Sequence, residues 1–199
     1  DICADAENFT ISFTYSGAEP SSYSVYFDQA AHKEGLNDIF NHPFGANLDV
    51  VIPLPHKEKV LYQQHADYIR PGTYQFRLVL DNGVCGLSKS DTLSMLVKYP
   101  SWIIEQNWMD VVAPLTAEYN GGYQFGQYEW YVNGERQQTN GTPYLYSQTL
   151  RVGDQVVLYA TRIGDSYSIP TCPLTISLAG DDAYETPIMI YPNQAPRQK

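Results

Sequence analysis

Four histidines, which are among the commonest metal ligands in proteins, lie within one interval of the chain, between Gln29 and Ala66. They are His32, His42, His56 and His65. No two of them are two or four positions apart, the spacings that place two imidazoles on one face of a strand or a helix. The aspartates of this region, Asp38, Asp49 and Asp67, do not form a calcium-binding loop of the D-x-D-x-D-G type. We therefore predict no metal site and no cofactor.

The motifs of the common hydrolases are missing from the sequence. It contains no G-x-S-x-G, no H-E-x-x-H and no glycine-rich phosphate loop. Isolated serines, aspartates and histidines could converge only through the fold, and no spacing favours such a site. We predict that the protein is not an enzyme and has no catalytic residues.

Three cysteines, Cys3, Cys85 and Cys172, lack the close spacing of metal ligands. Cys3 precedes the first expected strand and Cys85 follows an expected hairpin turn. A disulfide between Cys3 and Cys85 would attach the N-terminus in an oxidising compartment, and this is the pairing that we predict. Cys172 would then be buried and free, or paired between molecules.

Tyrosine is unusually frequent, with 17 residues in a chain of 199. Flat aromatic rings stack on sugars and on partner side chains, so exposed tyrosines are candidate ligand-binding residues. We expect Tyr131, Tyr144 and Tyr146 to bind a ligand, together with His42 and His56 of the histidine-bearing interval. The alternative is that these tyrosines cover a sheet while their hydroxyls meet water.

The formal net charge of -10 and the pI near 4.6 argue against a nucleic-acid partner, which requires clustered Lys and Arg. No stretch approaches the roughly 18 consecutive apolar residues of a membrane span, so we expect no membrane insertion. The N-terminus Asp1-Ile2-Cys3 lacks the features of a signal peptide. We expect a mature or truncated form of an exported protein.

Alternating apolar and polar residues predict β-strands along the chain. Two strands are especially clear, one from Phe9 to Tyr15 and one from Tyr74 to Leu80. A third, Tyr128 to Val132, runs into Asn133-Gly134, a strong signal for a hairpin. Its period places Trp130 in the core and Glu129 and Tyr131 on the opposite face. Between Trp102 and Leu115 we prefer strands to a helix because of Pro114 and the β-branched and aromatic content.

An internal repeat divides the sequence. The residues Tyr23, Val25 and Tyr26 fall opposite Tyr128, Trp130 and Tyr131, and Arg70-Pro71-Gly72 falls opposite Arg151-Val152-Gly153. The interval between these two matches is longer in the first copy, which predicts an enlarged middle segment at about 29–66. The fold class that we predict is all-β, with two tandem immunoglobulin-like β-sandwich domains at 1–98 and 99–199.

The second half carries a family resemblance. The runs Tyr99-Pro100-Ser101-Trp102, Tyr119-Asn120-Gly121-Gly122-Tyr123, Tyr128-Glu129-Trp130-Tyr131-Val132-Asn133-Gly134 and Thr171-Cys172-Pro173-Leu174 resemble immunoglobulin-like or PKD-like modules of secreted and surface proteins from Bacteroidetes. The resemblance extends more loosely to the first half, through Arg70-Pro71-Gly72. It implies an adhesin-like or spacer role, and it transfers no catalytic residues.

We expect an exported, cell-surface binding or adhesion module that recognises a glycan or protein ligand without catalysis. Its location would be secreted, extracellular or at the outer-membrane surface. Structural spacer domains within a larger surface assembly are the first alternative. An accessory part of a carbohydrate-processing enzyme is the second.

Overall fold

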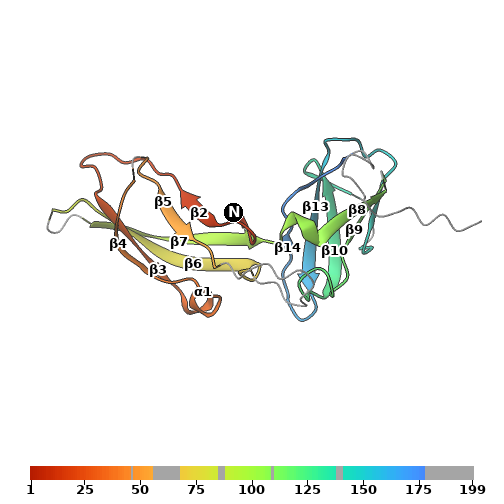
Figure 1. Ribbon diagram of the computed structural model, residues 1–199, viewed down its shortest axis with the longest axis horizontal. Helices are drawn as coiled ribbons and strands as arrows, with labels where there is room; N and C mark the ends of the chain where they lie inside the picture. Colours follow the sequence, from red (N-terminus) through yellow and green to blue (C-terminus); the bar gives the residue numbers. More distant parts are fainter. Residues whose placement is uncertain (46, 56–67, 85–87, 109, 138–140, 178–199) are drawn as a thin grey trace, which may run out of the picture.

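The computed structural model describes residues 1–45, 47–55, 68–84, 88–108, 110–137 and 141–177. In this part of the chain the structure is nearly all β, with one short α-helix and one 3-10 turn. The prediction of an all-β protein is therefore confirmed. The molecule is elongated, and the N-terminus lies near its middle (Figure 1).

The N-terminal part forms two sheets. A five-stranded sheet has the order β1-β7-β6-β3-β4, and β2 pairs with β5 in a second, two-stranded sheet. The elements are β1 (Ile2–Cys3), β2 (Asn8–Ile11), β3 (Ser22–Phe27), α1 (Gln29–Lys33), β4 (Ile39–Pro43), β5 (Val50–Pro53), β6 (Gly72–Asp81) and β7 (Ser88–Lys98). The strand expected at Phe9 to Tyr15 thus ends at Ile11.

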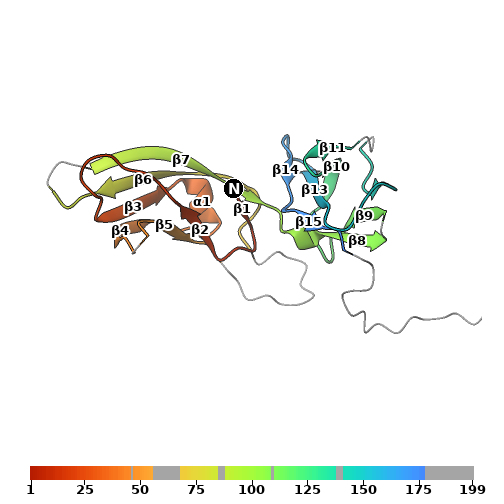
Figure 2. The ribbon, with the colours of Figure 1, turned by 90° about the horizontal axis from the view of Figure 1, so that it is seen from above.

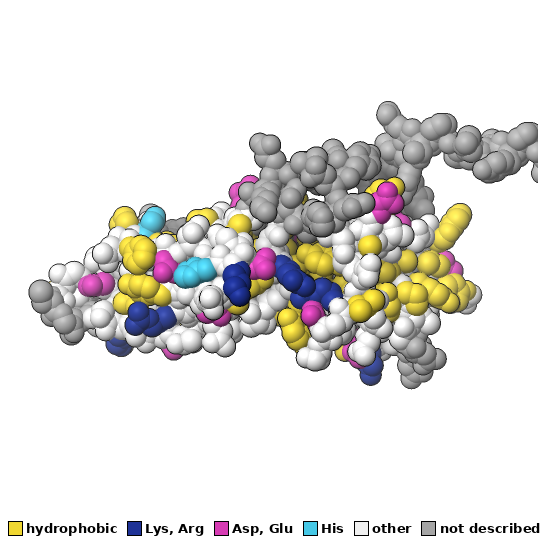
Figure 3. Space-filling view, turned by 90° about the horizontal axis from the view of Figure 1, so that it is seen from below, with side chains coloured by type: hydrophobic (Ala, Val, Ile, Leu, Met, Phe, Trp, Pro, Cys, Tyr) yellow, Lys and Arg dark blue, Asp and Glu magenta, His cyan; other side chains and the backbone are white. Residues whose placement is uncertain are grey.

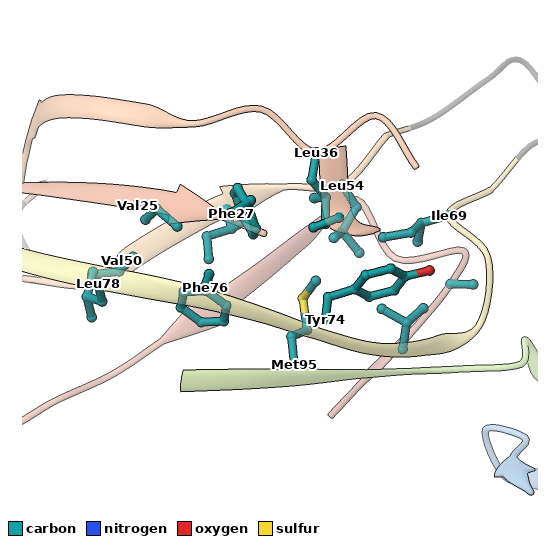
Figure 4. Packing of buried hydrophobic residues seen from close by; sticks show 14 of the residues in the cluster. Val25, Phe27, Leu36, Val50, Leu54, Ile69, Tyr74, Phe76, Leu78 and Met95 are labelled. Atoms are coloured by element: carbon teal, nitrogen blue, oxygen red, sulfur yellow. The ribbon is translucent and has the colours of Figure 1, made fainter. Parts of the chain in front are cut away.

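Side chains from both of these sheets build one hydrophobic cluster. Along β6 the alternation is regular, with Tyr74, Phe76 and Leu78 buried and the residues between them exposed. They meet Val25 of β3 and Val50 of β5, both fully buried (Figure 4). Burial of such side chains is worth about 1.5–3 kcal/mol each, so this cluster fixes which face of β6 points outward.

The enlarged segment at 29–66 is not simply a surface loop. Asp28 caps α1 by accepting a hydrogen bond from the backbone N–H of Ala31 at 2.7 Å, and Gly35 follows the helix at φ +92°, a conformation suited to glycine. Further on, β5 supplies core residues. The described part of the segment therefore belongs to the body of the protein. His56 and His65 lie outside the described residues.

The C-terminal part also forms two sheets. One has the order β11-β10-β13-β14, with β15 also pairing with β13, and the other has the order β12-β9-β8. The elements are the 3-10 turn Ser101–Ile103, β8 (Ile104–Trp108), β9 (Val111–Pro114), β10 (Phe125–Val132), β11 (Glu135–Arg136), β12 (Leu145–Tyr146), β13 (Gln155–Arg162), β14 (Ile169–Pro170) and β15 (Leu174–Thr175). The preference for strands over a helix after Trp102 is confirmed for β8 and β9.

Trp130 is fully buried in a second hydrophobic cluster, as its place in the alternation predicted. It pairs with Leu158 of β13, and its indole Nε1 donates to the carbonyl oxygen of Thr142 at 3.2 Å. The hairpin is also confirmed, because Asn133 (φ 51°) and Gly134 (φ 83°) both have positive φ between β10 and β11.

The two halves share an order of pairing. β3 pairs with β6 as β10 pairs with β13, and β2 pairs with β5 as β9 pairs with β12. In Figure 2, β6 and β7 lie on one side of the N-terminal part and β2 and β5 on the other. β10, β13 and β14 lie on the same side as β6 and β7. The sequence repeat therefore corresponds to a repeat of strand pairing.

The predicted disulfide is wrong. Cys3 is bonded to Cys172, with 5.9 Å between their Cα atoms, and Cys85 lies outside the described residues. The reason is the pairing at the junction of the two halves. β1 runs parallel to the end of β7, which places Cys3 beside Lys98, and the next residue, Tyr99, bridges to Thr171. The segments that contain Cys3 and Cys172 thus both pair with the chain at Lys98 and Tyr99.

Removing this disulfide should destabilise the protein. We expect Cys3→Ser or Cys172→Ser to lower the free energy of unfolding by about 2–4 kcal/mol, because a cross-link over a long loop restricts the unfolded chain. Urea unfolding would measure the change. Cys85→Ser is the matched control. Mass spectrometry without reduction should still find the peptide that contains Cys3 linked to the peptide that contains Cys172. A bridged peptide containing Cys85 would contradict the structure.

The β10–β11 turn provides a second test. The amide of Asn133 donates to Asp154 Oδ1 at 2.9 Å and accepts from the backbone N–H of Gln155 at 2.9 Å. Asn133→Ala removes both bonds and places a less tolerant residue in the left-handed region, so we expect thermal denaturation to show a loss of about 1–2 kcal/mol. Asn133→Gly retains the backbone freedom and should lose less. Equal losses in both variants would assign the whole effect to the hydrogen bonds.

Candidate ligand-binding site

The outer face of β10 and β13 is the side of this sheet opposite to the one that carries the buried Trp130. Because Trp130 and Leu158 are buried, their strand neighbours Glu129, Tyr131 and Tyr159 point to the other side of the sheet. Glu129 is directly opposite Tyr159 in the register. Side chains separated along two strands are thereby brought onto one surface.

Two tyrosines meet on this face. The rings of Tyr131 and Tyr159 lie with centroids 4.8 Å apart and an interplanar angle of 53°. Both residues are partly exposed, so the pair contacts solvent as well as the sheet. Rings held against each other in this way lose little further freedom when a flat apolar surface stacks on them.

A charged pair lies next to the tyrosines. The β10–β11 hairpin places Arg136 opposite Tyr131, and Arg136 Nη2 donates to Glu129 Oε1 at 3.0 Å. Both side chains are substantially exposed, so the ion pair adds little stability. Its effect at this site is to cancel the two charges and to present donors and acceptors in fixed positions.

Three of these side chains, Glu129, Arg136 and Tyr159, border a hollow of about 310 Å³. It is lined by Gly126, Gln127, Tyr128, Glu129, Arg136, Gly141, Tyr159, Thr161 and Ser168. The lining combines aromatic surface with amide, hydroxyl and paired ionic groups, the set of groups that binds the apolar faces and the hydroxyls of a sugar. Glu129 is the one carboxylate among these lining residues, so the hollow lacks the two carboxylates of common glycosidases.

The structure separates the predicted binding residues. Tyr131 does not line the hollow itself but contacts the ring of Tyr159, which does. Tyr146 is on β12 of the other sheet, and Tyr144 directly precedes that strand; they are 52% and 49% exposed. His42 is on β4 of the N-terminal part, where its Nδ1 lies 2.9 Å from the carbonyl oxygen of Pro43. The four described residues of this prediction therefore do not form one site, and His56 lies outside the described residues.

Tyr159 was not among the predicted residues. The alternation of β13 places Tyr159 on the face opposite Leu158, but only the register with β10 shows that it meets Tyr131. The pairing is continuous from Gln127 to Val132, and no local signal in the sequence announces this register.

A second hollow, of about 380 Å³, has a mixed lining. Leu115, Phe125 and Ile163 contribute apolar surface, and Thr116 and Gln124 contribute polar groups. Hydrophobic side chains gather over the C-terminal part on the face shown in Figure 3.

The junction between the halves buries an arginine and several phenols. Arg162, 8% exposed, donates from Nε to Asp165 Oδ2 at 2.6 Å and from Nη2 to the carbonyl oxygen of Pro71 at 3.3 Å. Tyr99 is fully buried, with its ring centroid 5.1 Å from that of Tyr123. Burial raises the pKa of Tyr123 to about 12 and the pKa of Tyr99 further still. The phenols at this junction are therefore neutral over the physiological range.

The described residues show neither a metal-binding cluster nor a membrane-spanning helix. No group of three or more His, Cys, Asp or Glu side chains is placed to hold a metal ion. Within the same residues, no helix has the length and apolar character required to cross a membrane.

Comparison with known proteins identifies no family. No family model and no curated protein matches the chain. Among solved structures, the chain is similar to the fibronectin(III)-like modules of Clostridium thermocellum CbhA, with 13% identity and a TM-score of 0.30. That match covers 92% of this chain and 91% of the other. At this TM-score the likeness supports no inference, and the resemblance to Bacteroidetes surface modules stays a prediction.

The raised pKa of Tyr123 predicts a dependence of stability on alkaline pH. The folded state holds the phenolic proton more tightly, so the contribution is complete below the unfolded pKa of about 10 and is lost as pH rises toward 12. Tyr123→Phe should make the decline in unfolding free energy above pH 10 shallower in urea titrations at successive pH values. Tyr119→Phe, at an exposed tyrosine, controls for the loss of a hydroxyl. An unchanged slope in Tyr123→Phe would contradict the assignment.

Proposed function

We propose that the protein is a non-catalytic binding module that recognises a glycan through the outer face of β10 and β13. The observation that supports this most directly is the hollow lined by Tyr159 and by the Glu129–Arg136 ion pair, with the ring of Tyr131 packed against Tyr159. Aromatic surface provides stacking, and the fixed polar groups provide selectivity for hydroxyl positions. Because the charged pair is neutral overall, the ligand at this site is an uncharged sugar.

The proposed architecture is two tandem immunoglobulin-like β-sandwich modules that meet near residue 99. Two features support it. Val97 belongs to the first hydrophobic cluster and Tyr99 to the second, so the boundary between the clusters lies near residue 99. The same strand pairing also recurs in both halves. Each cluster receives side chains from two sheets, as a sandwich requires.

An exported, cell-surface location is part of the proposal. The disulfide between Cys3 and Cys172 supports it, because structural disulfides persist in oxidising compartments. At a surface, a module of this kind acts as an adhesin toward glycan-bearing partners.

A structural spacer is the second candidate function, and the junction favours it. The halves are joined by the disulfide, by Arg162 bonded to Pro71 and by contact between the rings of Tyr68 and Trp102. Such connections resist bending between modules. A spacer needs stiffness but no ligand. The two candidate functions therefore differ in whether the Tyr131–Tyr159 pair is required for binding a ligand.

A glycan array distinguishes these candidates. We expect the intact chain to bind neutral glycans, and Tyr131→Ala and Tyr159→Ala each to weaken the best hit about tenfold or more, equivalent to about 1.4 kcal/mol. Tyr146→Ala is the matched control, since it removes an exposed tyrosine from the other sheet. Circular dichroism and thermal denaturation would verify that all variants fold.

Loss of binding in Tyr146→Ala with retention in Tyr131→Ala would move the site to β12. The absence of binding by the intact chain to any glycan would favour the spacer.

A further inference from the structure

The outer face of β3 and β6 carries a second cluster of aromatic and charged groups, in the N-terminal part. The register aligns Tyr26 with Arg77 and Arg77 with Thr92 of β7, all on the side of the sheet away from the core. Phe40, on the neighbouring edge strand β4, stands beside them. These residues are far from the hollow at Tyr131 in sequence and belong to a different sheet.

Tyr26 contacts the other two side chains. The Arg77 guanidinium carbon lies 4.7 Å from the centroid of the Tyr26 ring, a cation–π contact. The Phe40 ring packs edge-on against Tyr26, with centroids 5.7 Å apart and an interplanar angle of 75°. Tyr26 thus orients both a cation and a second ring.

Phe40 is 64% exposed, an unusual position for a large apolar side chain. The backbone around it is held firmly. Ser24 Oγ accepts from the N–H of Asn41 at 2.9 Å, the register of β3 and β4 shifts between Tyr23 and Val25, and Asn41 has φ 46°. Irregular pairing of this kind re-aims side chains at a sheet edge. The exposure of Phe40 is therefore built into the edge strand.

Arg77 differs from the arginine of the first site in its charge balance. Arg136 is neutralised by Glu129. Arg77 is exposed, and no described carboxylate forms an ion pair with it. In a chain of net charge -10, this guanidinium is oriented by Tyr26 and has no ion-pair partner among the described carboxylates. Charge complementarity therefore favours a negatively charged ligand here.

We propose that Phe40, Tyr26 and Arg77 form a second binding site, specific for a sugar that carries a carboxylate. Arg77 binds the carboxylate through its planar N–H groups, the exposed ring of Phe40 stacks on the apolar face of the sugar, and the hydroxyls of Thr92 and Ser90 border the row. We choose a sugar as the ligand because Phe40 offers a flat, exposed stacking surface, and poly-glutamate distinguishes this ligand from an acidic peptide. This site is independent of the proposed site at Tyr131.

Titration calorimetry with an oligogalacturonate and with its fully methyl-esterified form tests the proposal, since the two probes share a backbone and differ in charge. We expect the intact chain to bind the acid and not the ester. Arg77→Gln should weaken binding about tenfold or more, and Phe40→Ser should weaken it as well. Binding should also fall as salt is raised.

Two matched variants make the result specific. Arg151→Gln removes the same charge from an exposed turn and should leave binding unchanged. Tyr131→Ala should leave galacturonate binding unchanged too, which separates this site from the neutral one. Thermal denaturation of each variant checks its folding.

Three results would overturn the proposal. Equal binding of acid and ester would remove the role of the carboxylate. Equal losses in Arg77→Gln and Arg151→Gln would show attraction by charge alone. Binding of poly-glutamate with the same loss in Arg77→Gln would assign the surface to acidic peptides.

Discussion

The burial of Trp130 is the constraint on which the C-terminal surface depends. A fully buried indole fixes the face of β10 that meets the core, so Glu129 and Tyr131 must lie on the other face. Its Nε1 also donates to Thr142, in the connection after the hairpin, close to Gly141 of the hollow's lining. One core residue thus sets the orientation of the strand and helps to place the loop. A shift of one residue in register would exchange the core and ligand faces.

Alternation predicted the clearest strands, because burial of one face of a sheet gives the sequence of each strand a period of two. It identified β6 and the C-terminal half of β10 with the buried position of Trp130, although it extended β2 beyond Ile11. It failed where structure depends on remote pairing. Cys3 meets Cys172 because β1 pairs with the end of β7 and Tyr99 bridges to Thr171. No local pattern encodes a contact between the first and the last segments of the described chain.

The difference between local alternation and remote pairing also explains which residues of the candidate site could be predicted. Tyr131 could be identified because its neighbours show which face it occupies. Tyr159 could not, because its contact with Tyr131 depends on the register of two strands. Tyr144 and Tyr146 are indeed exposed, but they belong to the β12 sheet. Composition and local pattern therefore predicted exposed tyrosines, and only topology shows which of them act together.

The internal repeat clarifies how two surfaces of different chemistry arise on one fold. Tyr26 and Tyr131 occupy equivalent positions on β3 and β10, and each has an arginine opposite it. For Tyr26 that arginine comes from β6, and for Tyr131 it comes from β11. Glu129 neutralises only the second. Inward positions are constrained by packing density, whereas outward positions tolerate substitution. The same strand pairing therefore recurs in both halves with outer faces of different charge.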